Sequence, residues 1–85
     1  AAICAAPKVL GNAGLLDGRT ATSYPGAMAG ADFGKTSLSE QAVVRDGTVI
    51  TSRGPGTAMD FALTLIEILS GADKRQAVET PLLRP

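Results

Sequence analysis

The first part of the chain orders its apolar and small residues in a pattern that predicts a strand, a helix and a second strand. Residues 1–3 form an apolar run that is typical of the end of a buried strand. A helix is expected from about residue 5 to residue 13, because Pro7 fits a first helical turn, where its missing N–H would have no acceptor. Gly14 can supply a left-handed cap after this helix. A short strand over residues 19–22 is then expected.

The segment after this strand has few large apolar side chains. Pro25 stops the strand, and residues 26–39 are rich in Gly, Ala and Ser. This composition predicts a partly helical surface loop, with Met28 and Phe33 as the anchors that attach it to the core.

A hairpin follows this loop. Residues 41–45 and 48–52 are expected to be strands, because they are rich in β-branched residues and flank the pair Asp46-Gly47. Gly adopts the positive φ of a tight turn without a steric penalty from a Cβ atom, so an Asp-Gly pair is a strong hairpin signal.

The last third of the chain predicts two helices. Residues 53–57 form a Gly- and Pro-rich loop that opens the clearer helix, which ends near Gly71. Residues 72–79 are expected to form a short final helix, and Pro81 is expected to force an extended tail. An apolar stripe at helical spacing predicts the buried face of the first helix. Its members are Phe61, Leu65, Ile68 and Leu69, with Ala58 and Ala62 on the same side.

The order strand, helix, strand, hairpin, helix fits an α/β layer fold. The chain has 85 residues, whereas domains usually contain about 100–200, so one small domain or a piece of a larger one is expected. A three-layer sandwich needs several parallel strands joined by helices, and only two or three candidates for central strands are present. We therefore interpret the chain as part of such a fold.

The composition of the chain argues against several classes of function. The 8 basic and 8 acidic side chains cancel, so the electrostatic footprint of a nucleic-acid-binding protein is absent. No apolar run approaches the ~20 residues that cross a bilayer, and no membrane partner is expected. With one Cys and no His, neither an internal disulfide nor a zinc site is expected. These features favour a reducing compartment, and we expect a cytoplasmic protein without a metal or another cofactor.

Cys4 is the candidate nucleophile, because it lies between the first strand and the first helix. A residue at such an elbow points away from the sheet, and the N–H groups that follow it can hold negative charge. These donors favour the thiolate form of the Cys4 side chain, and the small side chains of Ala5 and Ala6 leave the sulfur open to close approach. The alternative interpretation is a small buried apolar residue, which is common for free Cys. Local sequence leaves both interpretations open.

Two motifs together resemble a known family. The first is residues 2–7, Ala-Ile-Cys-Ala-Ala-Pro, followed by Leu10 and the Gly-Leu-Leu of residues 14–16. The second is Ser-Arg-Gly-Pro-Gly-Thr at residues 52–57. At this separation they resemble the ThiJ/PfpI superfamily, and more narrowly its DJ-one branch, over almost the entire chain.

The resemblance implies a flavodoxin-like three-layer sandwich with a mostly parallel sheet, of which residues 1–85 are the C-terminal half of a single domain. It also implies a homodimer, with the cysteine in a pocket near the dimer contact. The N-terminal half of the domain, which lies outside this chain, would supply a glutamate that hydrogen-bonds the sulfur. A pair of glycines in that half would supply further N–H donors.

The resemblance also assigns roles to individual residues. Cys4 would be catalytic and the backbone of Ala5 an oxyanion donor, and Pro81 would reach across the dimer. The pocket lining would consist of Ala6, Tyr24, Arg53, Gly54 and Pro55. Arg53 would either attract an anion or pair with a carboxylate to fix its loop.

Two positions depart from the family pattern. Ala5 stands where many relatives with claimed peptidase activity place a His, and Tyr24 stands where the DJ-one branch has one. A phenol is a weak base near neutral pH, so Tyr24 is expected to shape the pocket rather than to shuttle protons.

The resemblance implies a glyoxalase or deglycase that uses Cys4 against a small dicarbonyl such as methylglyoxal, with a role in stress responses. The alternative is a non-enzymatic redox sensor or chaperone that uses an oxidisable cysteine. A cysteine peptidase is less favoured, because a Cys–His pair is impossible within a chain that has no His.

Overall fold

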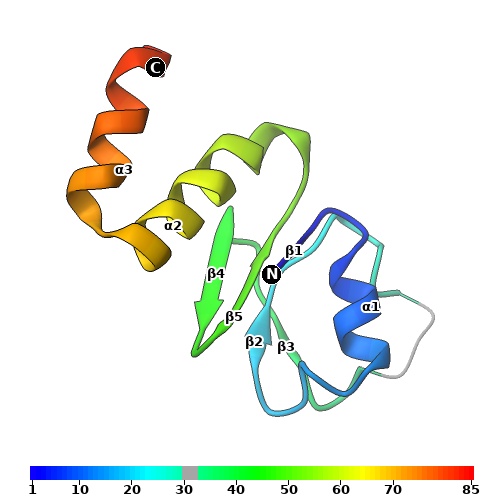
Figure 1. The fold of residues 1–85 in the computed structure, drawn as a ribbon. Coiled ribbons are helices and arrows are strands. Elements are labelled where there is room, and N and C mark those ends of the chain that lie inside the picture. The colour runs from blue at the N-terminus through cyan, green and yellow to red at the C-terminus, as the bar shows by residue number, and fades with distance from the viewer. Residues whose placement is uncertain (30–32) are drawn as a thin grey trace.

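A computed structural model describes residues 1–29 and 33–85. Strands and helices alternate through its first two thirds, and two helices form an arm at the C-terminal end (Figure 1). The elements in chain order are β1 (Ala2–Ile3), α1 (Pro7–Asn12), β2 (Thr20–Ala21), β3 (Ser37–Leu38), β4 (Val43–Asp46), β5 (Val49–Ser52), the 3-10 helix η1 (Pro55–Thr57), α2 (Ala58–Ser70), α3 (Ala72–Glu79) and the 3-10 helix η2 (Thr80–Leu82).

The strands form two small sheets, one with a parallel and an antiparallel pair and one with a single parallel pair. The larger sheet has the order β1-β5-β4, with β1 parallel to β5 and β4 antiparallel to β5. In the smaller sheet β2 lies parallel to β3. The mixed α/β class with parallel pairing is therefore confirmed. The hairpin is confirmed as well, with Gly47 at a φ of +60° in its turn.

One core cluster lies beneath α1 and the loop that follows β2. Its centre is Leu16, which is fully buried, together with Ala21 and Met28. Phe33 packs against this cluster, so the prediction that Met28 and Phe33 anchor the loop is confirmed. The predicted loop also included residues 30–32, which lie outside the described residues.

A glycine in α1 permits this packing. A Cβ atom on Gly11 would lie 2.5 Å from Cε1 of Phe33 and 3.2 Å from the terminal methyl of Met28. The Phe33 ring therefore rests directly on the helix backbone, and a larger residue at this position would push it away.

The hairpin is attached to β2 through Asp46. One carboxylate oxygen accepts the Thr20 N–H at 2.7 Å, and the other lies 3.5 Å from the guanidinium of Arg19. Arg19 also donates to the main-chain carbonyl of Asp46 at 2.9 Å. The turn residue of the hairpin thus connects the two sheets.

The structure corrects several predicted boundaries. The helix begins at Pro7 rather than near residue 5, and β4 begins at Val43 rather than at residue 41. The Ser37–Leu38 strand was not predicted, because both of its side chains are exposed and main-chain bonds define it. The N–H of Ser37 donates to the carbonyl of Arg19, which aligns this segment with β2.

The predicted buried face of α2 is partly wrong. Leu69 is 81% exposed, whereas Leu63, which was not in the predicted stripe, is 1% exposed. The reason is that α2 contacts two partners, the β4–β5 hairpin and α3, so burial does not follow a single stripe. Phe61, Leu65 and Ile68 are half-buried, and Ala58 and Ala62 are exposed.

The predicted extended tail is also wrong. Pro81 lies within η2, and the chain then turns at Leu83, which has a φ of +51°. Pro is compatible with an early position of such a turn, because its φ is already near the helical value. The turn brings Arg84 back to Asp60 of α2, and Arg84 also pairs with Glu79 of α3 at 3.1 Å.

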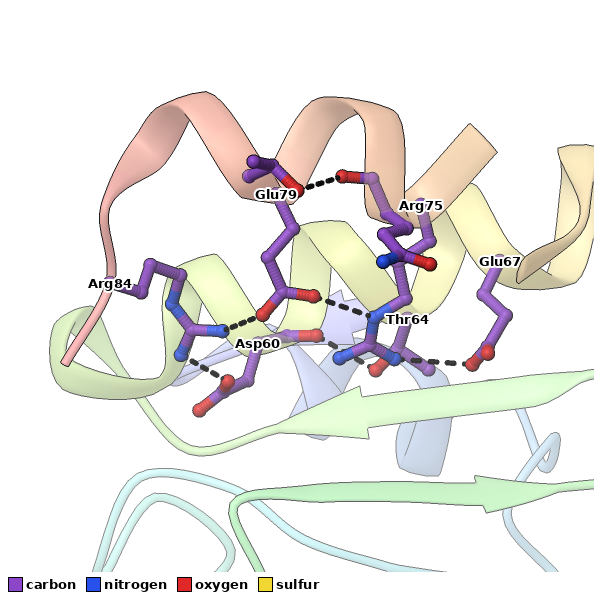
Figure 2. Close-up of polar contacts among 8 residues, drawn as sticks. Asp60, Thr64, Glu67, Arg75, Glu79 and Arg84 are labelled. Carbon is purple, nitrogen blue, oxygen red and sulfur yellow. Dashed lines mark hydrogen bonds and ion pairs between the residues drawn. The ribbon is translucent and has the colours of Figure 1, made fainter. Parts of the chain in front are cut away.

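A ladder of alternating charges joins α2, α3 and the C-terminal end, as Figure 2 shows. Arg75 lies 3.1 Å from Glu67 of α2 and 3.4 Å from Glu79 of its own helix. Burial lowers the pKa of Arg75, but hydrogen bonds and charge from both glutamates more than offset this, so the pKa is raised. Glu79 is shared by both arginines, which makes it the central member of the ladder.

We predict that Gly11→Ala destabilises the protein by about 1 kcal/mol in urea unfolding. Alanine favours a helix over glycine by up to ~1 kcal/mol, but overpacking against Phe33 costs roughly 1–3 kcal/mol. Gly56→Ala is the matched control, because nothing lies within 4 Å of its new Cβ atom. A stabilised Gly11→Ala variant would show that the Phe33 ring does not rest on the helix.

We predict that Arg84→Met lowers the free energy of unfolding by about 0.5–1 kcal/mol at low salt, because two partly exposed ion pairs are lost. Methionine keeps most of the apolar stem, and Arg45→Met, at an exposed position without an ion pair among the described residues, is the control. The deficit of Arg84→Met should shrink in about 1 M sodium chloride, which screens charges beyond ~3 Å. An equal deficit at both salt concentrations would assign the effect to packing instead.

Candidate functional site

The backbone at Cys4 has the conformation of a strained elbow. Its φ is +66°, and Leu83 is the one other non-glycine residue with positive φ in the described part of the chain. A left-handed conformation costs an L-residue roughly 1–2 kcal/mol, so surrounding bonds must hold it in place. The N–H of Cys4 donates to the carbonyl of Ser52 at 3.1 Å, which extends the β1–β5 pairing to the elbow itself.

The main-chain N–H groups that follow Cys4 differ in their hydrogen bonds. The Ala6 N–H donates to the carbonyl of Ile3 at 3.1 Å, and Pro7 has no N–H. Within residues 1–29 and 33–85 the Ala5 N–H has no hydrogen-bond partner. The Cys4 thiol is free and half-buried. The cysteine thus lies at the surface of the sheet edge rather than deep in an apolar interior, with an amide donor from the next residue.

Tyr24 is attached to the elbow through its backbone. Its N–H donates to the carbonyl oxygen of Cys4 at 2.8 Å. Tyr24 is 52% exposed, and its ring lies against Gly54, where an added Cβ atom would be 3.2 Å from Cδ2 of the ring. The absence of a side chain at Gly54 therefore lets the Tyr24 ring approach the loop closely.

The hydroxyl of Thr57 organises the loop that follows β5. Its Oγ1 accepts the N–H groups of Arg53 and Gly54 at 3.2 and 3.1 Å and lies 3.0 Å from the Gly54 carbonyl. The Ser52 hydroxyl lies 2.7 Å from the Thr57 hydroxyl and 2.6 Å from the carbonyl of Ala42. The Ser52 hydroxyl donates to the Ala42 carbonyl, and the Thr57 hydroxyl donates to the Gly54 carbonyl.

The roles of the Ser52 and Thr57 hydroxyl groups were not predicted from the sequence. The sequence does contain a signal for these roles, since a hydroxyl residue stands directly before and directly after the Arg-Gly-Pro-Gly segment. Such side chains commonly satisfy the N–H and carbonyl groups of tight turns.

Arg53 is held by main-chain carbonyls. Its Nε donates to Ser23 at 3.3 Å and its Nη1 to Glu40 at 3.4 Å. No ion pair joins Arg53 to a carboxylate in the described part of the chain. The interpretation that Arg53 pairs with a carboxylate to fix its loop therefore finds no such partner among the described residues.

Two adjoining hollows lie beside these residues, with volumes of about 400 and 240 Å³. Tyr24, Pro25 and Arg53 line both of them, and Gly54 and Pro55 line the smaller. The structure therefore brings together four of the five residues predicted to line the pocket. Ala6 is exposed at the start of α1 and lines neither hollow.

Two further predicted site residues lie outside these hollows. Cys4 lines neither hollow, but its carbonyl oxygen accepts the N–H of Tyr24, which lines both. Pro81 is exposed in η2, and the C-terminal end of the chain stands apart from β1 and α1 (Figure 1). A larger hollow of about 670 Å³ lies at that end, between α3 and the last residues.

The described residues contain neither a cluster of metal ligands nor a membrane-spanning helix. No group of three or more His, Cys, Asp and Glu side chains among them is placed to hold a metal ion. None of their helices is long and apolar enough to cross a membrane.

Curated relatives match nearly the whole chain. Protein dj-1beta of Drosophila melanogaster is 47% identical over 83 residues, and the Parkinson disease protein 7 homolog of Danio rerio is 48% identical over 87. Each match covers 98% of this chain but 44% of the relative. Glutathione-independent glyoxalase DJR-1.2 of Caenorhabditis elegans is 40% identical over 95% of this chain and 43% of its own length. The chain thus spans less than half the length of the curated relatives it matches.

Solved structures share the fold. The crystal structure of Drosophila melanogaster DJ-1beta superposes with a TM-score of 0.85 at 44% identity, over 99% of this chain and 46% of that one. Oxidized Toxoplasma gondii DJ-1 superposes with a TM-score of 0.82 at 37% identity, over 96% of this chain and 45% of that one.

A family model completes the comparison. The model of the DJ-1/PfpI family matches residues 1–68, which include both the Cys4 elbow and the loop before α2. The resemblance that those two motifs indicated is confirmed, and the chain belongs to the DJ-1/PfpI family.

Proposed function

We propose that the protein is a cofactor-independent glyoxalase or deglycase that uses Cys4 against small dicarbonyls such as methylglyoxal, with a role in stress responses. The observation that carries the proposal is the elbow, where Cys4 has a φ of +66° and is followed by an Ala5 N–H without a hydrogen-bond partner among the described residues. The name of the Caenorhabditis elegans relative, a glutathione-independent glyoxalase, supports the same activity.

The first step is addition of the thiolate to the aldehyde carbon. A C–S bond forms, and the π electrons of the carbonyl move to its oxygen. The Ala5 N–H donates a hydrogen bond to this oxyanion, which is stabilised because the donor is already in position. Protonation of the oxygen then gives a hemithioacetal on Cys4.

The second step rearranges this adduct. One proton leaves the former aldehyde carbon and one arrives at the ketone carbon, so the first carbon is oxidised and the second reduced without an outside oxidant. Water then attacks the resulting thioester, the C–S bond breaks, and the hydroxy acid leaves with regeneration of the thiolate. Methylglyoxal would give lactate.

The proton transfers need a group beyond this chain. The chain has no His, and the phenol of Tyr24 is a weak base that serves better as a hydrogen-bond partner at the rim. The family resemblance implies a glutamate in the N-terminal half of the domain, and we assign the transfers to it. The same lack of His disfavours a cysteine peptidase.

The proposal includes two partners and a location. The chain matches part of longer relatives, so the N-terminal half of the same domain is the first partner. The second is another copy of the protein, with exposed Pro81 reaching toward the other subunit's site. A cytoplasmic location is supported by the single free cysteine, which suits a reducing compartment.

We predict that Cys4→Ser lowers kcat/KM for methylglyoxal by about 10³-fold or more, because an unactivated hydroxyl is a far weaker nucleophile than a thiolate. Lactate formation by the purified full-length protein measures this. Ala13→Ser, which places a hydroxyl at an exposed position after α1, is the matched control and should retain full activity. Unchanged turnover in Cys4→Ser would overturn the proposal.

A redox sensor or chaperone is the second candidate. The Toxoplasma gondii relative was solved in a form described as oxidized, and Cys4 is free and half-buried rather than enclosed. The Cys4 thiolate would attack a peroxide oxygen, the O–O bond would break, and hydroxide would leave to give a sulfenic acid. A second peroxide would give the sulfinate, an anion that the Ala5 N–H can stabilise.

We predict that mild peroxide adds two oxygen atoms to the peptide that contains Cys4. Peptide-level mass spectrometry is required, because Met28 and Met59 can also take up oxygen. The Cys4→Ser protein, treated in parallel, should show no added oxygen on this peptide. An unmodified Cys4 in the wild type, beside oxidised methionines, would rule out the sensor role.

A further inference from the structure

The arginines of the described chain differ in how their charge is balanced. Arg19, Arg75 and Arg84 each form an ion pair with at least one carboxylate. Arg45 and Arg53 form none with the described residues. Arg45 is exposed beside the hairpin turn, where water solvates its charge, whereas Arg53 is half-buried. Arg53 is thus the partly enclosed guanidinium without a counter-charge in this part of the molecule.

The guanidinium of Arg53 is also held in place. Nε and Nη1 donate to the carbonyls of Ser23 and Glu40, at 3.3 and 3.4 Å, and the Arg53 N–H is bound by the Thr57 hydroxyl. No bond to its Nη2 is found among the described residues. A guanidinium that is fixed at one edge and open at another is suited to bind an oxyanion, since little side-chain entropy is lost on binding.

Arg53 faces space of the right size for a small ligand. It lines both the 400 and the 240 Å³ hollow, and Tyr24 and Pro25 provide apolar walls to each. The Tyr24 N–H donates to the carbonyl of Cys4, so a residue that lines both hollows is hydrogen-bonded to the elbow. Sites that combine apolar walls with one fixed charged group typically select ligands by that charge.

We propose that Arg53 binds the carboxylate of the substrate, and that the preferred substrates are 2-oxoaldehydes that carry a carboxylate. The aldehyde end would lie at Cys4, and the carboxylate would meet the open edge of Arg53 between Tyr24 and Pro25. The turnover part of this inference rests on the proposed function, whereas the binding part does not.

The Glu40 carboxylate is the nearest competitor for Arg53 along the chain. Its main-chain oxygen already accepts from Arg53, but its side chain is exposed and forms no ion pair with Arg53. Glu40 also lines the 400 Å³ hollow, so its negative charge weakly opposes an anion there. Glu40→Gln should therefore strengthen carboxylate binding only slightly. A gain of about tenfold would show that Glu40 neutralises Arg53 and would overturn the inference.

Binding is tested first, without chemistry, by calorimetric titration of the full-length protein. The probe is 4-oxopentanoate, a carboxylate that lacks the aldehyde, beside neutral 2-pentanone. Arg53→Gln should weaken binding of 4-oxopentanoate by about tenfold or more, as expected for loss of a charge-assisted bond, and leave 2-pentanone unchanged. Arg45→Gln is the matched control and should bind like the wild type. Equal binding of both probes by the wild type, or no loss in Arg53→Gln, would overturn the inference.

Turnover is tested second, as the ratio of kcat/KM for 4,5-dioxopentanoate to that for methylglyoxal. The wild-type ratio should exceed one, and Arg53→Gln should lower it about tenfold or more, while Arg45→Gln should leave both kcat/KM values unchanged. Arg53→Lys keeps the charge but not the planar guanidinium, so it should give an intermediate ratio. It replaces Arg53→Gln in this test if that variant does not fold. A wild-type ratio of one or less overturns the substrate preference. Binding without turnover of either aldehyde would refute the proposed function and leave carboxylate binding at Arg53 standing.

Discussion

The candidate site depends on the parallel pairing of β1 with β5. This pairing aligns Ile3 with Ser52, and the Cys4 N–H extends it by one further bond to the Ser52 carbonyl. A parallel pair cannot be closed by a tight turn, so α1, β2, β3 and β4 all lie in the connection between the two strands. Ser52 also begins the loop that carries Arg53. The elbow and the loop, which are far apart in sequence, are therefore positioned by the same few hydrogen bonds.

Much of the fold could be predicted from local sequence, because several signals act over a few residues. Pro7 in the first turn of α1, Asp46-Gly47 in the hairpin and Gly71 after α2 all stand where the structure has those features. The Ser37–Leu38 strand could not be predicted, since main-chain bonds to β2 define it and its side chains are exposed. The burial of Leu63 instead of Leu69 depends on how α2 meets α3, which periodicity alone does not specify.

The candidate site was predictable where a residue's chemistry is local. Cys4 at a strand-to-helix elbow is of this kind, whereas the contact of Gly54 with the ring of Tyr24 joins distant segments and was not predicted. The contacts of Arg53 were not predictable, because they reach Ser23 and Glu40 in other segments. The roles of Ser52 and Thr57 were missed because hydroxyl groups fit many loops, and only their mutual distance reveals that they act on the same turn.

The two peptide groups that flank Cys4 are bound by different parts of the chain. Its N–H donates to the carbonyl of Ser52 in β5, and its carbonyl accepts the N–H of Tyr24, from the segment that follows β2. Cys4 therefore lies between two separately paired segments, and its left-handed conformation depends on the contacts that its backbone makes with both. A change that separates β5 from the segment after β2 would therefore release the Cys4 backbone from its left-handed conformation.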